Sequence, residues 1–167
     1  ADAVLRSKLL YGLDSAQLIP SVSKRLETFQ LKVFRKILRM DTTFVNRQNT
    51  NKHVFDNANQ KLEEEGRKKK DLESYVDTYI KMKRKRACKI ITKTDDPIHK
   101  VTFFGNTLRK WIHFGRRVGK PRMNWTEETV REIWDHLKKD DNRYKYTAFN
   151  QDSEEIMQVI REYAENY

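Results

Sequence analysis

Apolar side chains recur at helical spacing along most of this chain. The clearest stripe advances in steps of 4, 3, 4, 4 and 3 residues and comprises Val22, Leu26, Phe29, Val33, Ile37 and Met40. Steps of three and four residues are typical of one face of an amphipathic α-helix. They predict a helix over about 22–40. A leucine-rich stripe predicts an earlier helix over 3–17, and Pro20 and Ser21 separate the two.

Polar segments divide the middle of the chain. Residues 42–52 are rich in Asn and Thr and predict a loop that ends in an N-cap at Asn49 or Asn51. A modest helix follows over about 54–62. Gly66 indicates its end or a hinge, and the helical period resumes near residue 71 and continues to about residue 90. The run Asp95-Asp96-Pro97 stops that helix, and its proline is expected to open a short turn.

The last third of the chain begins with the least helical segment, residues 101–125, which we expect to be a hairpin or an irregular loop. A well-formed helix start follows: Thr126 is the predicted N-cap, and Trp125 and Val130 have the spacing of a hydrophobic staple. The apolar face of this helix is Val130, Ile133, Trp134 and Leu137. A final helix is expected to be capped near Asp152 or Ser153, with a face of Ile156, Val159, Ile160 and Tyr163.

Composition supports a helical fold. The chain has 167 residues, of which 37% are hydrophobic and 35% are charged, with only 5 Gly and 3 Pro to build turns. We predict a mainly α protein, a bundle of about five to six helices with the basic segment 101–125 inserted. Its parts are a helical region 1–95, a basic loop plus helix 96–140 and a C-terminal helix 141–167, packed as one compact unit.

A formal net charge of +11 indicates an anionic partner. Nucleic acid is the first candidate, an anionic membrane surface the second and an acidic protein the third. The helix over 22–40 carries a basic stripe beside its apolar one, and an ordinary solvated helix face is the alternative interpretation. The stripe comprises Arg25, Lys32, Lys36 and Arg39.

Two further basic clusters are candidate nucleic-acid contacts. The run "KMKRKR" (81–86) supplies Lys83, Arg84 and Arg86. The run "RRVGKPR" (116–122) contains a Gly and a Pro that let the backbone approach phosphate, and it supplies Arg116, Arg117, Lys120 and Arg122. Trp111 is a candidate for stacking on unpaired bases. Core packing is the preferred interpretation for Trp125 and Trp134, and it is also favoured over stacking for Trp111.

The sequence contains no pattern typical of catalysis, so we predict that the chain is not an enzyme. It lacks a Gly-rich phosphate loop and the H-E-x-x-H and G-x-S-x-G motifs. Its four histidines and single cysteine have no metal-ligand spacing, and no cofactor is expected. Asp95-Asp96 is better explained as a helix stop than as a two-metal site, and Cys88 as a small hydrophobic side chain. No run of 18 apolar residues exists, so we expect no transmembrane helix.

Four blocks follow one another along the chain: "SKLLYGLDSAQL" (7–18), "RLETFQLKVFRKIL" (25–38), "NTNKHVF" (49–55) and "GRRVGKPRMNWTEETVREIW" (115–134). In this order they resemble the region beyond the catalytic core of non-LTR (LINE-type) retrotransposon reverse transcriptases. The chain departs from that family where Leu-Gly-His-x-x-Arg is usual, because Cys88 and Lys89 stand in place of Gly-His and Thr92 in place of Arg. The family's terminal Cys/His knuckle and the palm's aromatic-x-Asp-Asp motif are absent.

The resemblance implies a thumb-like helical region that holds nucleic acid by its backbone, without polymerase activity. We therefore predict a non-catalytic RNA-binding protein within a larger ribonucleoprotein, such as an organellar ribosome, which would place it in mitochondria or another organelle. One alternative is a fragment of an active LINE-type enzyme that grips template–primer, including an RNA–DNA hybrid, in the nucleus. The other is a helical protein–protein scaffold.

Overall fold

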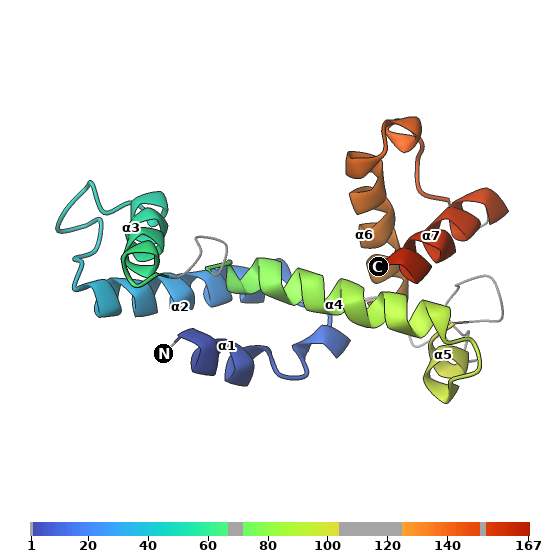
Figure 1. Ribbon diagram of the computed structural model, residues 1–167, viewed down its shortest axis with the longest axis horizontal. Helices are drawn as coiled ribbons and strands as arrows, with labels where there is room; N and C mark the ends of the chain where they lie inside the picture. The colour runs from blue at the N-terminus through green and yellow to red at the C-terminus, as the bar shows by residue number, and fades with distance from the viewer. Residues whose placement is uncertain (1, 67–71, 104–124, 151–152) are drawn as a thin grey trace, which may run out of the picture. The chain divides into compact units, whose positions relative to one another are not determined.

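A computed structural model describes residues 2–66, 72–103, 125–150 and 153–167 (Figure 1). Those ranges contain no strand, which agrees with the predicted mainly α fold. Their seven α-helices are α1 (Asp2–Leu10), α2 (Pro20–Leu38), α3 (Asn51–Glu64), α4 (Tyr75–Thr92), α5 (Pro97–Thr102), α6 (Trp125–Asp140) and α7 (Glu154–Asn166). Two 3₁₀ turns are η1 (Leu13–Ser15) and η4 (Asn142–Tyr144). The helix beyond the expected six is the short α5, which Pro97 opens where we expected only a turn.

The chain divides into two compact units. Unit 1 comprises Ala1–Leu10 and Leu18–Ile80, and unit 2 comprises Tyr11–Gln17 and Lys81–Tyr167. The division therefore falls inside α4, whereas the sequence suggested a boundary near residue 95. An 18-residue helix is roughly 27 Å long at 1.5 Å per residue, which is enough for its two halves to belong to separate packed clusters.

Unit 1 is built on the packing of α2 against α3. Its buried cluster comprises Leu31, Phe34, Val54 and Ala58. The rings of Phe34 and Phe55 meet edge to face, with their centroids 5.4 Å apart. Thr50 is the N-cap of α3, because its hydroxyl accepts a hydrogen bond from the backbone N–H of His53. The cap thus lies between the two asparagines that the sequence suggested.

The face that α2 buries differs from the one that its apolar stripe predicted. The buried residues of α2 are Gln30, Leu31 and Phe34. The Gln30 amide donates to the Glu73 carbonyl at 2.9 Å and accepts from the Tyr75 N–H at 2.8 Å, so it fixes the segment that leads into α4. This contact draws the Gln30 side of α2 inward. Part of the predicted apolar stripe consequently remains exposed.

Unit 2 has a continuous core that three helices share. The cluster contains Ala87, Cys88 and Ile91 from α4, Val130, Ile133, Trp134 and Leu137 from α6, and Ile156, Met157, Ile160 and Ala164 from α7, with Phe103 after α5. Trp134 is fully buried, and its indole N–H donates to the carbonyl of Thr147 at 3.3 Å. Val159 and Tyr163 pack at the edge. The apolar faces predicted for α6 and α7 are therefore confirmed.

The helix ends of unit 2 follow the sequence closely, with one correction. Asp96 caps α5 by accepting from the N–H of Ile98 at 2.7 Å, and Ser153 caps α7. Thr126 is not the N-cap of α6, because α6 already begins at Trp125. The Thr126 hydroxyl instead donates to the carbonyl of Thr102 at 3.4 Å.

The start of α4 in unit 1 is later than predicted. The helix begins at Tyr75 and not near Asp71. The Ser74 hydroxyl accepts hydrogen bonds from the N–H groups of Val76 and Asp77, as an N-cap does, which explains why the helix starts there.

Candidate nucleic-acid interface

The most basic stretch of the described chain lies on α4 and just beyond it. From Lys81 to Lys93 there are seven Lys and Arg residues and no Asp or Glu. These side chains point in different directions, because an α-helix completes one turn every 3.6 residues. The burial pattern of α4 divides the cations into a buried set and an exposed set.

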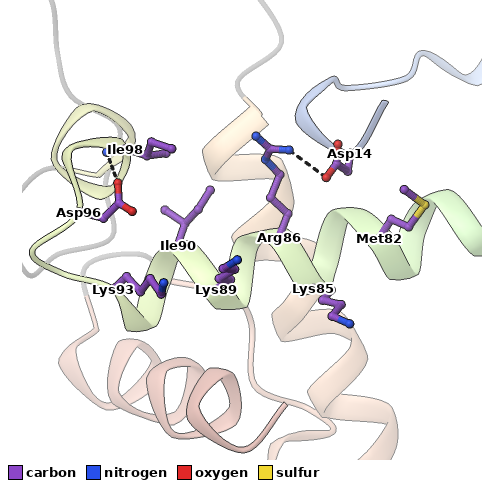
Figure 2. A pocket seen from close by; sticks show the side chains of 9 residues that line it. All are labelled: Asp14, Met82, Lys85, Arg86, Lys89, Ile90, Lys93, Asp96 and Ile98. Carbon is purple, nitrogen blue, oxygen red and sulfur yellow. Dashed lines mark hydrogen bonds and ion pairs between the residues drawn. The ribbon is translucent and has the colours of Figure 1, made fainter. Parts of the chain in front are cut away.

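The exposed set lines a groove of unit 2. Its volume is about 490 Å³, and it is bounded by Asp14, Met82, Lys85, Arg86, Lys89, Ile90, Lys93, Asp96 and Ile98 (Figure 2). The residues from α4 recur at steps of three and four and so share one helix face. Apolar side chains from α4 and α5 provide part of its lining, and cations provide most of its polar groups. Such a surface suits an anionic ligand that also has apolar parts.

The two acids of the groove are already engaged. Asp14 accepts a hydrogen bond from the Arg86 guanidinium at 2.9 Å, and Figure 2 shows Arg86 extending from α4 to that carboxylate. Asp96 is occupied as the cap of α5. Lys85, Lys89 and Lys93 are exposed and form no ion pair with any residue in the described ranges. Three ammonium groups on one face therefore remain available for a ligand.

Lys83, a predicted nucleic-acid contact, lies inside the fold. Its side chain is 0% exposed, and its Nζ lies 2.9 Å and 3.0 Å from the two carboxylate oxygens of Glu132 on α6. It also donates to the side-chain carbonyl of Gln17. Its ammonium is thus used within unit 2, and Lys83 is not part of the candidate surface.

Arg84 lies on the side of α4 that faces α6 and α7. Burial lowers the pKa of His136 below its usual 6.5, and the Arg84 charge lowers it further. Burial has the opposite effect on the Tyr163 phenol and raises its pKa, whereas the nearby Arg84 charge lowers it. Arg84 is therefore close to α6 and α7, away from the groove on the opposite face of α4.

Cys88 has the environment of a core residue. It is buried, and this burial raises the pKa of its thiol from 9.0 to about 11, although the nearby Arg84 charge acts in the other direction. A thiol that is protonated at neutral pH is a poor nucleophile and a poor metal ligand. The interpretation of Cys88 as a small hydrophobic side chain is confirmed.

The predicted basic stripe of α2 lies in unit 1. Arg25, Lys32, Lys36 and Arg39 are all exposed. Arg39 is the C-cap of α2 in a left-handed conformation (φ 54°), so its side chain leaves the helical series of the other three. The remaining predicted contacts, Trp111, Arg116, Arg117, Lys120 and Arg122, lie outside the described residues, and their role stays a prediction.

Three lysines of the groove were not among the predicted contacts. Lys85, Lys89 and Lys93 follow one another at steps of four, a helical spacing that was visible in the sequence. The predicted contacts were instead Lys83, Arg84 and Arg86, which are close in sequence within the dense basic run 81–86. Neighbours in sequence do not share a helix face.

Two further kinds of feature are absent from the described residues. They contain no group of three or more His, Cys, Asp or Glu that could hold a metal ion. No helix in the described ranges is long and apolar enough to cross a membrane. No protein-family model, curated protein or solved structure matches this chain.

Proposed function

We propose that this protein is a non-catalytic RNA-binding protein and that the groove along α4 holds the phosphate backbone. One observation carries the proposal. Lys85, Lys89 and Lys93 lie on one exposed face of a segment without acids, and none has an ion-pair partner among the residues described. When these cations bind phosphate, condensed counterions are released, and no ion pair among the described residues has to break.

The spacing of the lysines favours a linear polyanion over a small one. Lys85 and Lys89 are four residues apart, which places them about 6 Å apart along the axis of α4, and Lys93 follows one residue beyond the end of that helix. A single phosphate would contact one or two of these ammonium groups. A polynucleotide strand, which carries a charge roughly every 3.4 Å of its axis, engages all three.

The same geometry supports backbone binding without base reading. Lysine ammonium groups are point charges that do not discriminate between bases as paired planar donors do. Met82, Ile90 and Ile98 add apolar surface that contacts sugar carbons. We therefore expect similar affinity for unrelated RNA sequences. This behaviour fits a component of a larger ribonucleoprotein, where assembly supplies the specificity.

A salt titration tests the proposal. Binding of labelled RNA to the whole protein is measured over a range of salt, and the slope of log affinity against log salt counts the phosphates neutralised. In the variant Lys85→Gln/Lys89→Gln/Lys93→Gln, the slope should become smaller in magnitude by about 2–3.

The matched control removes the same charge elsewhere. Lys24, Lys52 and Lys61 are exposed on α2 and α3 of unit 1. Changing these three to Gln should alter the slope by less than about 1, since only the general field of the protein changes. The proposal fails if the two triple variants lose slope and affinity equally, or if the unmodified protein has a slope near zero.

A further inference from the structure

The helix α2 leaves apolar side chains half exposed along one line. Ile19, immediately before the helix, is 44% exposed, and on the helix Val22, Phe29 and Ile37 are 40%, 41% and 52% exposed. Leu26 and Val33 lie between them and are partly buried, and Val33 packs against the buried cluster of unit 1. A helix that packs on one side normally buries its apolar stripe. Here the stripe lies beside the packed side, and much of it remains open.

This open stripe has the spacing of a coiled-coil seam. Val22 and Phe29 take the d positions of a heptad, and Leu26 and Val33 take the a positions, because the steps between them are 4, 3 and 4. Arg25 directly precedes Leu26, and Lys32 directly precedes Val33. Both cations therefore take g positions, which flank the seam and select the partner by charge.

The flanking cations are available to a partner. Arg25 and Lys32 are exposed, and neither forms an ion pair with a residue that the structure describes. Lys36 is also exposed and unpaired within those ranges, but it takes the d position one heptad after Phe29, so the apolar seam ends there. The nearest acid on α2 is Glu27, and its position in the heptad is on the opposite side of the helix.

We propose that this face of α2 docks one acidic amphipathic helix of a partner protein. Apolar residues of that helix would cover the seam, and Asp or Glu residues along its edge would pair with Arg25 and Lys32. The inference does not rest on RNA binding by α4, because α2 belongs to unit 1 and the groove to unit 2. It assigns a second partner to the protein.

Other occupants fit the face less well. In an antiparallel pair with a second copy of this chain, g positions face g positions, so Arg25 and Lys32 would meet like charges. In a parallel pair they would face the e positions, where Ser23 offers no charge and Gln30 is buried within unit 1. Phosphate needs the cations but gains little from the apolar seam. A membrane interface buries an apolar face about 5–10 Å deep, which suits fully presented side chains better than half-exposed ones.

Synthetic peptides test the pairing directly. The first probe is a four-heptad peptide with Ile at a, Leu at d and Glu at both e and g, whose own repulsion keeps it from pairing with itself. The second has Lys at e and g, and the third keeps Glu but has Ser at a and d. Fluorescence anisotropy with the whole protein should show binding of the first peptide. The other two should bind at least tenfold more weakly.

Variants of the protein locate the binding on α2. Val22→Asp/Phe29→Asp should weaken binding of the acidic peptide at least tenfold. Arg25→Glu/Lys32→Glu should reverse the preference, so that the Lys peptide binds better than the Glu peptide. Both pairs are exposed, and far-UV circular dichroism verifies that the variants fold. The groove variant Lys85→Gln/Lys89→Gln/Lys93→Gln should leave peptide affinity within about twofold, since those lysines belong to the other unit.

Several outcomes would overturn the inference. It is wrong if the Glu and Lys peptides bind equally, or if Arg25→Glu/Lys32→Glu fails to reverse the preference. It is also wrong if Val22→Asp/Phe29→Asp reduces binding to anionic vesicles while no peptide binds, which would assign the face to a membrane. Loss of RNA affinity in Arg25→Glu/Lys32→Glu without any peptide effect would assign the face to nucleic acid. A flat salt slope for RNA beside intact peptide binding would reject the proposed function alone.

Discussion

The buried ion pair between Lys83 and Glu132 leads to an asymmetric prediction about stability. The Lys83 side chain is 0% exposed, whereas that of Glu132 is 43% exposed. Removing the glutamate leaves an ammonium in the interior whose one remaining partner among the described residues is the Gln17 side chain. Removing the lysine leaves a carboxylate that water can reach. The two single changes should therefore have unequal costs.

The magnitudes follow from the burial of each charge. Breaking a buried pair by removing one partner costs about 3–5 kcal/mol when the remaining charge is uncompensated. Because Gln17 still accepts from Lys83, we expect Glu132→Ala to lower the free energy of unfolding by about 2–4 kcal/mol. Lys83→Met keeps an unbranched chain of similar length in the same space, and we expect it to cost less than about 1.5 kcal/mol.

Urea denaturation followed by circular dichroism measures both costs. The double variant Lys83→Met/Glu132→Ala should be more stable than Glu132→Ala alone, because the orphaned ammonium has been removed. Equal costs for the two single changes would refute this reasoning. The same Lys83→Met protein also tests the functional assignment. Its RNA affinity and salt slope should be unchanged, and a slope reduced by about 1 would show that Lys83 contacts phosphate after all.

Other features of unit 2 give predictions of their own. Burial raises the pKa of the Cys88 thiol from 9.0 to about 11, so the thiol should react slowly with a thiol reagent at neutral pH and rapidly in urea. Because the folded state binds that proton more tightly than the unfolded state, the free energy of unfolding should fall as pH rises from about 9 towards 11. Rapid labelling of the folded protein would contradict this. The His136 pKa, lowered mainly by burial, should titrate below 6.5 in NMR, and since the unfolded state then binds the proton better, stability should decrease as pH falls through that range. Asp140→Asn should lower the His136 pKa further, because the Asp140 charge raises it. Ser153→Ala, which removes the cap of α7, should cost about 0.5–2 kcal/mol in urea unfolding. Trp134→Ala should cost about 3–5 kcal/mol, and a loss below about 1 kcal/mol would show that α6 is not central to the core.

Helix starts that depend on a capping side chain close in sequence were predictable from the sequence. The start of α7 follows from Ser153, whose hydroxyl accepts from the N–H of Ile156 three residues later. The cap of α5 follows from Asp96 in the same way. These contacts join residues within one turn, so a short stretch of sequence contains all of the information they need. The apolar faces of α6 and α7 were predictable for a related reason, since each stripe is complete within one helix.

The orientation of α2 was not predictable from its own pattern. The stripe from Val22 to Met40 correctly indicates a helix, but it does not fix which side faces the rest of unit 1. That side depends on Gln30, whose amide bonds to the backbone of Glu73 and Tyr75, more than forty positions away. A polar residue with distant backbone partners resembles a surface residue in the sequence. Only the folded chain distinguishes the two.

The burial of Lys83, in contrast, could have been recognised from the sequence. It follows Tyr75 and Tyr79 at steps of four and precedes Ala87 and Ile91 at the same steps, and all five residues are buried. A cation within an apolar stripe of this kind is expected to meet an acid from another helix, and Glu132 supplies it. The position of a charge in the helical period is therefore more informative than the density of charges around it.

The two exposed basic faces differ in the residues that lie beside their cations. On α4 and just beyond it, three exposed lysines without an ion-pair partner among the described residues adjoin acids that are already bonded, so the face offers unbalanced positive charge in a groove that also has apolar lining. On α2, the cations adjoin a half-exposed apolar seam, so the face offers charge and apolar surface together. A polyanion makes full use of the first face, and an acidic helix makes full use of the second. If net charge alone governed binding, the charge-matched variants Lys85→Gln/Lys89→Gln/Lys93→Gln and Lys24→Gln/Lys52→Gln/Lys61→Gln would be indistinguishable.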